Sequence, residues 1–217
     1  MAGQVGDAER DRDRWFASPS CVELPAGVSI RPVQKVSDYD DIMKPLMAGD
    51  LEALEEIALI VDSFPGGRDD FISRHWITNA IDCGTMEVVA WMLSKQVPVV
   101  FRDDEGFTVL HSAIDREKPD RIEIIRMLLE AGADVDARGI NDYTPAHHAA
   151  IRNDVEALRL LVESGADLSL RTRIDEYATP LEEAKMMGGA TEAVAYLQSI
   201  RQGGANESMT RSDSKSE

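Results

Sequence analysis

One stretch of the chain repeats itself, and this constrains the fold more than any other feature. The segments GFTVLHSAI at 106–114 and DYTPAHHAA at 142–150 share threonine, histidine and alanine at equal spacing. Downstream, IEIIRMLLEAGADV and VEALRLLVESGADL match in turn, and the glycines in these matches, Gly132 and Gly165, lie 33 residues apart. Self-similarity at this period is typical of folds that stack one small unit many times.

Other copies extend the repeat in both directions. ATPLEEA at 178–184 repeats the start of the unit, and HWITNA at 75–80 aligns with it upstream. The faintest copy is GDLEAL at 49–54. The segment DREKPD at 115–120 adds residues to one copy, and its proline predicts a longer turn between two helices.

Each copy predicts a pair of short helices. Thr144 can cap the first helix and Pro145 suits its first position. Ala149 and Ala150 are small and allow a neighbouring backbone to approach. Residues 155–162 place their apolar side chains on one face of a second helix, and Gly165 supplies the left-handed conformation that ends it. A single pair cannot bury its apolar face alone, so the copies must stack.

The chain resembles the ankyrin-repeat family. The residues that carry the resemblance are GFTVLH at 106–111, DYTPAHHAA at 142–150, TPLEEA at 179–184 and the two GAD triplets at 132–134 and 165–167. The resemblance implies an all-α solenoid of about five stacked helix-turn-helix repeats with short β-hairpin-like loops. It also implies that the protein acts by binding another protein and not as an enzyme.

One departure from the family pattern concerns the hairpin turn. Asp142 stands where the family usually has glycine, which Gly106 supplies in the preceding copy. Aspartate is among the few residues that tolerate a positive φ, so the turn is expected to survive.

The histidines raise the question of chemistry. His111 and His147 occupy one repeat position, and the resemblance implies that this histidine forms hydrogen bonds within and between neighbouring loops and helices. His148 follows on the surface that is concave in the family. A metal or catalytic site would need acid or cysteine partners at suitable spacing, and none is evident. We therefore expect no metal, no cofactor and no catalytic residue. The alternative is an enzyme, or an accessory subunit of one, with a site contributed by residues 15–37.

Charge and composition limit the partners. The net charge of −17 argues against a nucleic-acid partner and against an anionic membrane, and suits a basic protein partner. The acidic run DLEALEEIALIVD at 50–62 is either a solvated face or a docking surface. The sequence shows no transmembrane stretch, no secretory signal and no cysteine framework for Cys21 and Cys83. We expect a cytoplasmic protein that is a monomer unless it is bound to its partner.

Composition divides the chain into four parts. Residues 1–14 are charged and expected to be disordered. Residues 15–37 hold Trp15 and Phe16 among prolines and predict an irregular arm that caps the first repeat. Residues 38–201 form the predicted ankyrin-repeat domain, and residues 202–217 are predicted to be a flexible tail.

The variable, solvent-facing positions of the family predict where a partner binds. Phe107 and Tyr143 share one repeat position and form either an exposed aromatic stripe or covers for their own hairpins. An inhibitor or immunity-type protein and a scaffold or accessory factor fit equally well. The predicted partner-binding residues are Asp104, Glu105, Phe107, Asp115, Arg116, Asn141, Tyr143, His148, Ile151 and Arg152.

Overall fold

A computed structural model describes residues 39–173 and 177–213, so the predictions for residues 1–14 and 15–37 lie outside the described residues. Its helices are α1 (Tyr39–Ala48), α2 (Leu51–Ala58), α3 (Trp76–Cys83), α4 (Met86–Ser94), α5 (Val109–Asp115), α6 (Arg121–Glu130), α7 (Pro145–Ile151), α8 (Val155–Glu163), α9 (Pro180–Met186) and α10 (Thr191–Asp213), with a 3-10 turn η1 (Ile140–Asp142) before α7.

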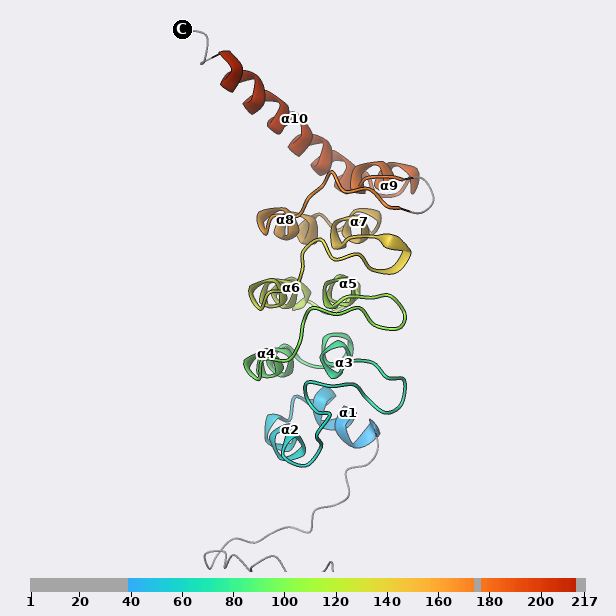
Figure 1. Ribbon diagram of the computed structural model, residues 1–217, viewed down its shortest axis with the longest axis vertical. Helices are drawn as coiled ribbons and strands as arrows, with labels where there is room; N and C mark the ends of the chain where they lie inside the picture. Colours follow the sequence, from blue (N-terminus) through green and yellow to red (C-terminus); the bar gives the residue numbers. More distant parts are fainter. Residues whose placement is uncertain (1–38, 174–176, 214–217) are drawn as a thin grey trace, which may run out of the picture. The chain divides into compact units, whose positions relative to one another are not determined.

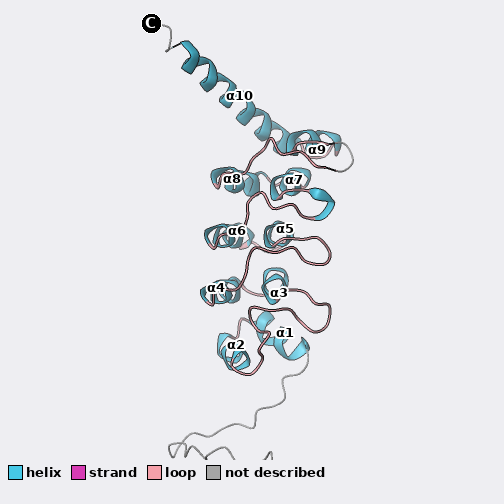
Figure 2. Cartoon of the chain, viewed as in Figure 1, coloured by secondary structure: helices cyan, strands magenta, loops and turns pink. Residues whose placement is uncertain are grey.

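The helices form five consecutive pairs. Helices α3, α5, α7 and α9 contact one another in chain order, and α4, α6 and α8 do the same (Figure 1). Loops project beside the first of these columns, and Figure 2 shows that the described part of the chain contains helices and loops without a strand. The all-α solenoid of five helix-turn-helix repeats is therefore confirmed.

The predicted hairpins are closed by backbone hydrogen bonds and not by strands. The amide of Asp103 donates to the carbonyl of Phe107 over 2.9 Å, and that of Gly139 donates to the carbonyl of Tyr143 over 2.7 Å. Each hairpin thus holds the start of the following helix in place.

Small residues allow the first helices of the repeats to stack closely. Ala80, Ala113 and Ala149 are completely buried, and Ala184 is almost so. All four occupy the same repeat position, five residues after the residue that caps the helix. A larger side chain here would push neighbouring repeats apart.

The second helices bury larger apolar side chains and begin at polar caps. Leu158 and Leu161 of α8 are completely buried, as the apolar spacing predicts. The Asp154 carboxylate accepts a hydrogen bond from the amide of Ala157, which satisfies one free donor of the first turn. Gly165 has a φ of +91° and ends the helix as predicted.

The far end of the repeats differs from its prediction. Helix α10 continues to Asp213, whereas the sequence predicts a flexible tail from residue 202. The tail prediction relied on the polar, low-complexity composition of residues 202–217, which include Gly203 and Gly204. Glycine weakens a helix interior by about 1 kcal/mol per residue without forbidding it, and no proline follows to stop the helix.

We predict that Gly165→Ala lowers the free energy of unfolding by about 1–2 kcal/mol, because alanine is strained in the left-handed region. The space around this glycine is open, so no steric clash contributes. Urea denaturation of the full chain measures the change. Gly189→Ala is the matched control, since Gly189 also has open space but no positive φ, and this variant should unfold like the parent. Equal losses in both variants would contradict the assignment of the cost to φ.

Candidate functional site

His111 and His147 connect one repeat to the next. The Nδ1 atom of His111 lies 2.7 Å from the hydroxyl of Thr108, and its Nε2 atom lies 3.1 Å from the carbonyl oxygen of Tyr143 in the next hairpin. Because a carbonyl oxygen only accepts, Nε2 carries the hydrogen and Nδ1 accepts from the threonine. His147 does the same with Thr144 and, over 3.0 Å, with the carbonyl of Ala178. The prediction that these histidines bond within and between repeats is confirmed.

The close approach of the next hairpin depends on Gly139. A Cβ atom at this position would lie 2.5 Å from the His111 ring, far inside van der Waals contact. The absence of a side chain lets the hairpin backbone lie against the imidazole. The histidine, the threonine and this glycine therefore form one packed unit between repeats.

Burial keeps these imidazoles neutral. The pKa of His111 is lowered to about 3, mainly because the completely buried ring would lose hydration on protonation. Burial also lowers the pKa of His147. A permanently neutral histidine held by two hydrogen bonds serves as a structural connector and is unsuited to proton transfer near neutral pH.

Four of the predicted partner-binding residues meet on helices α5 and α7 and at their ends. The Asp115 carboxylate accepts a 2.6 Å hydrogen bond from Nε2 of His148 and pairs with Arg152 over 2.9 Å. The ring of Phe107 meets the ring of His148 edge to face, at 6.3 Å between centroids. We call Phe107, Asp115, His148 and Arg152 the inner-helix cluster.

Within this cluster the exposure of His148 was predicted wrongly. The sequence placed His148 on the partner-facing surface, but only 7% of the residue is exposed. The reason is that Phe107 and Asp115 from the preceding repeat pack against it. His148 orients its neighbours and presents little surface of its own.

Arg116 is also misplaced by the sequence pattern. Its side chain is fully buried and donates to the carbonyl oxygens of Ile81 and Gly84 and to the Asp120 carboxylate. These carbonyls belong to the carboxyl end of α3, where a cation is favoured by the helix dipole. The insertion that contains Arg116 therefore caps the preceding repeat, and this residue is not a solvent-facing contact.

The other predicted contacts lie at the hairpin tips or beside them. Asp104, Glu105 and Asn141 are exposed, and Ile151 is half-buried at the end of α7. Tyr143 is half-buried and stacks on the His147 ring, with centroids 5.7 Å apart and planes inclined by 7°. Phe107 and Tyr143 are both half-buried and each ring contacts the histidine of its own repeat, so both of the roles that the sequence left open remain predictions.

Asp142 has a role that sequence reasoning missed. It has a φ of +60°, as predicted for a residue in place of glycine. Its carboxylate pairs with Arg138 in its own hairpin and with Arg173 in the next, both over 2.6 Å. The hydrogen bonds from Arg173 are the main reason that the pKa of Asp142 is lowered. Glycine could not make this link, so the departure from the family pattern joins two hairpins.

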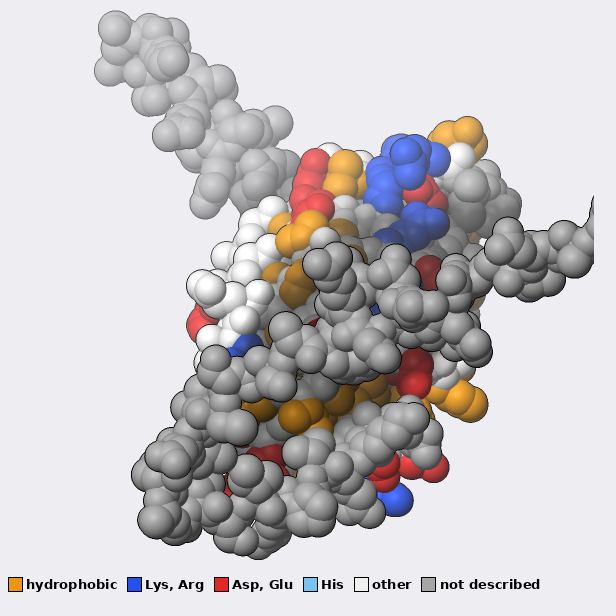
Figure 3. All heavy atoms as spheres, turned by 60° about the horizontal axis from the view of Figure 1, so that its bottom comes forward, with side chains coloured by type: hydrophobic (Ala, Val, Ile, Leu, Met, Phe, Trp, Pro, Cys, Tyr) orange, Lys and Arg blue, Asp and Glu red, His pale blue; other side chains and the backbone are white. Residues whose placement is uncertain are grey.

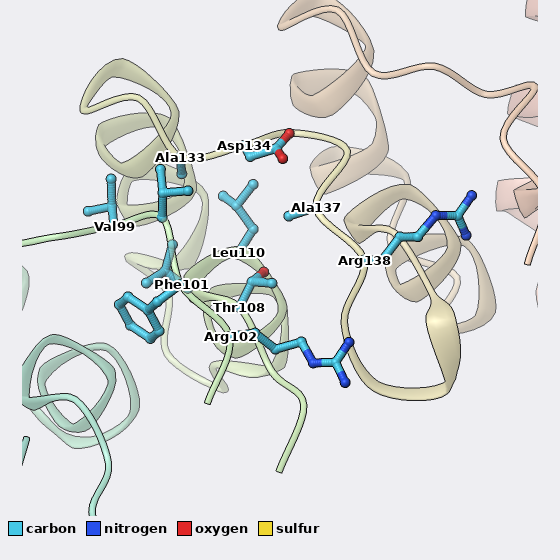
Figure 4. A pocket seen from close by; sticks show the side chains of 11 residues that line it. Val99, Phe101, Arg102, Thr108, Leu110, Ala133, Asp134, Ala137 and Arg138 are labelled. Atoms are coloured by element: carbon cyan, nitrogen blue, oxygen red, sulfur yellow. The ribbon is translucent and has the colours of Figure 1, made fainter. Parts of the chain in front are cut away.

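A small hollow of about 210 Å³ lies beneath two of the hairpins (Figure 4). Val99, Leu110 and Ala133 form its apolar side, and Arg102 and Arg138 extend their guanidinium groups to the opposite side. None of the predicted partner-binding residues lines this hollow.

A larger hollow of about 390 Å³ borders the inner-helix cluster. Its walls come from helices α3 and α5 and the segments beside them, and include Arg74 and Asp82, which the sequence did not suggest. These two form a 2.7 Å ion pair. The only sequence signal for the pair is two opposite charges eight residues apart.

Charges are unevenly distributed over the surface. On the face drawn in Figure 3, Lys and Arg side chains gather near the upper right, and Asp and Glu side chains are spread more widely. In the described part of the chain, no group of three or more His, Cys, Asp or Glu residues is arranged to hold a metal ion. No helix among the described residues has the length and apolar character needed to cross a bilayer.

Comparison with known proteins agrees with this geometry. Residues 115–162 match the family model described as ankyrin repeats (many copies). Residues 115–162 of the chain therefore consist of ankyrin repeats. Over 62 residues it is 36% identical to Protein fem-1 homolog A of Rattus norvegicus and to Protein fem-1 homolog A-A of Mus musculus. Each match covers 24% of this chain and 10% of the relative, so the chain spans about a tenth of the length of these curated relatives. Ankyrin repeats generally act as protein-interaction modules.

We predict that His147→Ala lowers the free energy of unfolding by roughly 1–3 kcal/mol, because the hydroxyl of Thr144 and the carbonyl of Ala178 lose their partner. Chemical denaturation measures the change. His75→Ala is a useful control, since neither ring nitrogen of His75 has a hydrogen-bond partner among the described residues. A loss at His147 no larger than that at His75 would refute the connector role.

We further predict that the ankyrin repeats lose stability as the pH falls below about 6.5. The pKa of His111 is near 3 in the folded protein and about 6.5 when unfolded, so the unfolded chain binds more protons between these values. Stability is complete above pH 6.5, and roughly 2–3 kcal/mol is lost from this residue by pH 4.5. Denaturation of the parent and of His111→Gln at pH 7 and 4.5 checks this. The variant should lose less on acidification, and an identical loss would contradict the assignment.

Proposed function

We propose that this ankyrin-repeat protein is a non-enzymatic binding module that holds one protein partner on the inner-helix cluster and the hairpin tips beside it. The observation that carries the proposal is the link made by Asp115, whose carboxylate joins His148 and Arg152 of the next repeat. This link fixes polar and aromatic groups of two repeats on one surface. A surface that is ordered before binding loses less entropy when the partner docks.

The chemistry of this surface favours recognition over catalysis. Phe107 offers an aromatic anchor beside charged groups, which is the usual anatomy of an interaction hot spot. The two connector histidines are buried and neutral, and so unsuited to general acid–base work.

The net charge of −17 favours a basic partner, which the acidic protein attracts at long range. Sequestering or inhibiting a basic enzyme or toxin would use this attraction directly, and positioning a partner as a scaffold would use it equally. We propose a cytoplasmic protein that is monomeric apart from its complex. The alternative of an enzyme or accessory subunit rests on residues 15–37, outside the described residues.

The prediction concerns the aromatic anchors. The partner is first identified by affinity capture with the full chain and mass spectrometry, and its affinity is then measured by calorimetry. The double variant Phe107→Ala, Tyr143→Ala should weaken binding by at least ~2 kcal/mol, or about thirtyfold. Because both rings pack on histidines, its helicity and melting are checked first.

Phe71→Ala is the matched control, since Phe71 is an aromatic residue with 72% of its surface exposed outside the proposed interface. This variant should bind like the parent. Unchanged affinity in a folded double variant would move the interface elsewhere, and the acidic surface of α2 would become the first alternative.

A further inference from the structure

One position carries an arginine in four successive hairpins. In each hairpin this residue directly precedes the backbone amide that closes the turn, which belongs to Asp69, Asp103, Gly139 or Thr172. Because the repeats stack, equivalent positions recur along one side of the solenoid. We call the four residues at this position the hairpin arginines: Arg68, Arg102, Arg138 and Arg171.

Three of the hairpin arginines are used by the fold. Arg68, Arg138 and Arg171 each donate from Nη1 to a backbone carbonyl of their own hairpin, over 2.7, 3.2 and 2.7 Å. Each also pairs with a carboxylate, of Asp104, Asp142 or Glu182 respectively. The charge of these three arginines is therefore largely engaged within the chain.

Arg102 is the exception. Its side chain is exposed, and it forms no hydrogen bond or ion pair with any other described residue. The hairpin does not need it, because the Asp103 carboxylate already accepts from the amides of Glu105 and Phe107 over 3.1 and 2.7 Å. The guanidinium of Arg102 is thus available to a group from outside the described chain.

The hollow of about 210 Å³ lies directly beside Arg102 (Figure 4). Its apolar side is formed by Val99, Leu110 and Ala133. Val100 also lines it and exposes 67% of its surface, which is a large fraction for an aliphatic residue. The volume is below the roughly 300–1,000 Å³ of small-molecule sites, so it has room for one aliphatic side chain.

The cationic and apolar parts of this surface are separated. Arg102 and Arg138 extend their guanidinium groups on the same side of the hollow, and Asp134 lies at the other end (Figure 4). The Asp134 carboxylate accepts a hydrogen bond from the amide of Asp136 and is not paired with either arginine. A ligand that combines a carboxylate with an aliphatic group therefore matches the surface.

The net charge of −17 does not prevent such a ligand from binding. Charges in physiological salt are screened over about 8 Å, so groups in direct contact decide the affinity more than distant ones. A guanidinium forms two parallel hydrogen bonds with a carboxylate, and these are stronger than bonds between neutral groups.

We propose that this surface binds an extended acidic segment of a partner protein, with a carboxylate on Arg102 and an aliphatic side chain in the hollow. In an extended segment, residues i and i+2 lie on the same face. The segment therefore carries its acid and its aliphatic residue two positions apart. This inference goes beyond the proposed function, because it concerns another surface and a ligand of opposite charge.

The test uses the full chain and synthetic peptides. Ac-Gly-Glu-Ala-Leu-Gly-NH₂ and the reverse order, Ac-Gly-Leu-Ala-Glu-Gly-NH₂, are titrated while backbone amide shifts are followed by NMR. We expect saturable shifts at Val100, Arg102 and Ala133 with at least one peptide. Replacing its glutamate by glutamine should weaken binding roughly threefold or more, and replacing its leucine by serine roughly fivefold or more.

Two variants that remove the same charge locate the site. Arg102→Gln should bind the glutamate peptide roughly threefold to fivefold more weakly and no longer distinguish it from the glutamine peptide. Its unfolding in urea should match that of the parent, because Arg102 has no partner among the described residues. Arg126→Gln is the control, since Arg126 is an exposed arginine of α6 outside the hollow, and this variant should bind like the parent.

Several results would overturn the proposal. They are equal binding of the glutamate and glutamine peptides to the parent, equal effects of the two variants, and shifts confined to other residues. Sedimentation of the parent and of Arg102→Gln adds a further check. A salt-sensitive dimer that is lost in Arg102→Gln would show that a second copy of this chain supplies the acid, and would overturn the assignment to a partner protein.

Discussion

The hydrogen bond from a buried histidine to the carbonyl of the next hairpin is the interaction on which the arrangement of the repeats depends. In an ankyrin solenoid each repeat contacts its neighbours alone, so the fixed rotation between repeats must be set locally. His111 and His147 set it by holding a threonine hydroxyl on one side and a carbonyl of the next repeat on the other. The inner-helix cluster lies directly on this frame, because its members are separated from the connector histidines by a few residues.

The same position changes character toward the ends of the repeats. Glu182 stands in place of the histidine in the last copy and returns its carboxylate to the amide of Thr179, with a pKa near 2 caused mainly by that hydrogen bond. Glutamate therefore caps its own helix, and Arg171 pairs with it on the surface. In the second copy Thr78 takes the position, and its buried hydroxyl has no hydrogen-bond partner in the part of the chain that the structure describes. The repeat boundaries that a buried histidine bridges are therefore those between the third and fourth repeats and between the fourth and fifth.

Local patterns in the sequence predicted most of the fold. The caps at Thr144 and Thr179, the helix end at Gly165 and the connector histidines follow from residue type and repeat position, and all are observed. What the sequence could not supply is contact between repeats outside the shared pattern. Arg116 lies in an insertion that has no counterpart in other copies, so nothing in the repeat predicts that it caps α3. The exposed fraction of His148 depends on Phe107 and Asp115, which belong to the preceding repeat.

The acidic composition acquires a different meaning once the side chains are placed. Asp50 and Asp154 cap helices, Asp103 holds a hairpin turn through the amides of Glu105 and Phe107, and Glu55 accepts from Trp91 and Lys95. These acids stabilise the fold, and their charge is partly compensated by backbone amides or neighbouring cations.

Net charge alone would spread the attraction for a basic partner over the whole molecule, with the acidic helix α2 as its centre. Around the hollow between α3 and α5 much of the charge is instead paired, since Asp82 pairs with Arg74 and Asp115 pairs with His148 and Arg152. The local pairing of the acids, more than their total number, therefore decides where negative charge stays uncompensated.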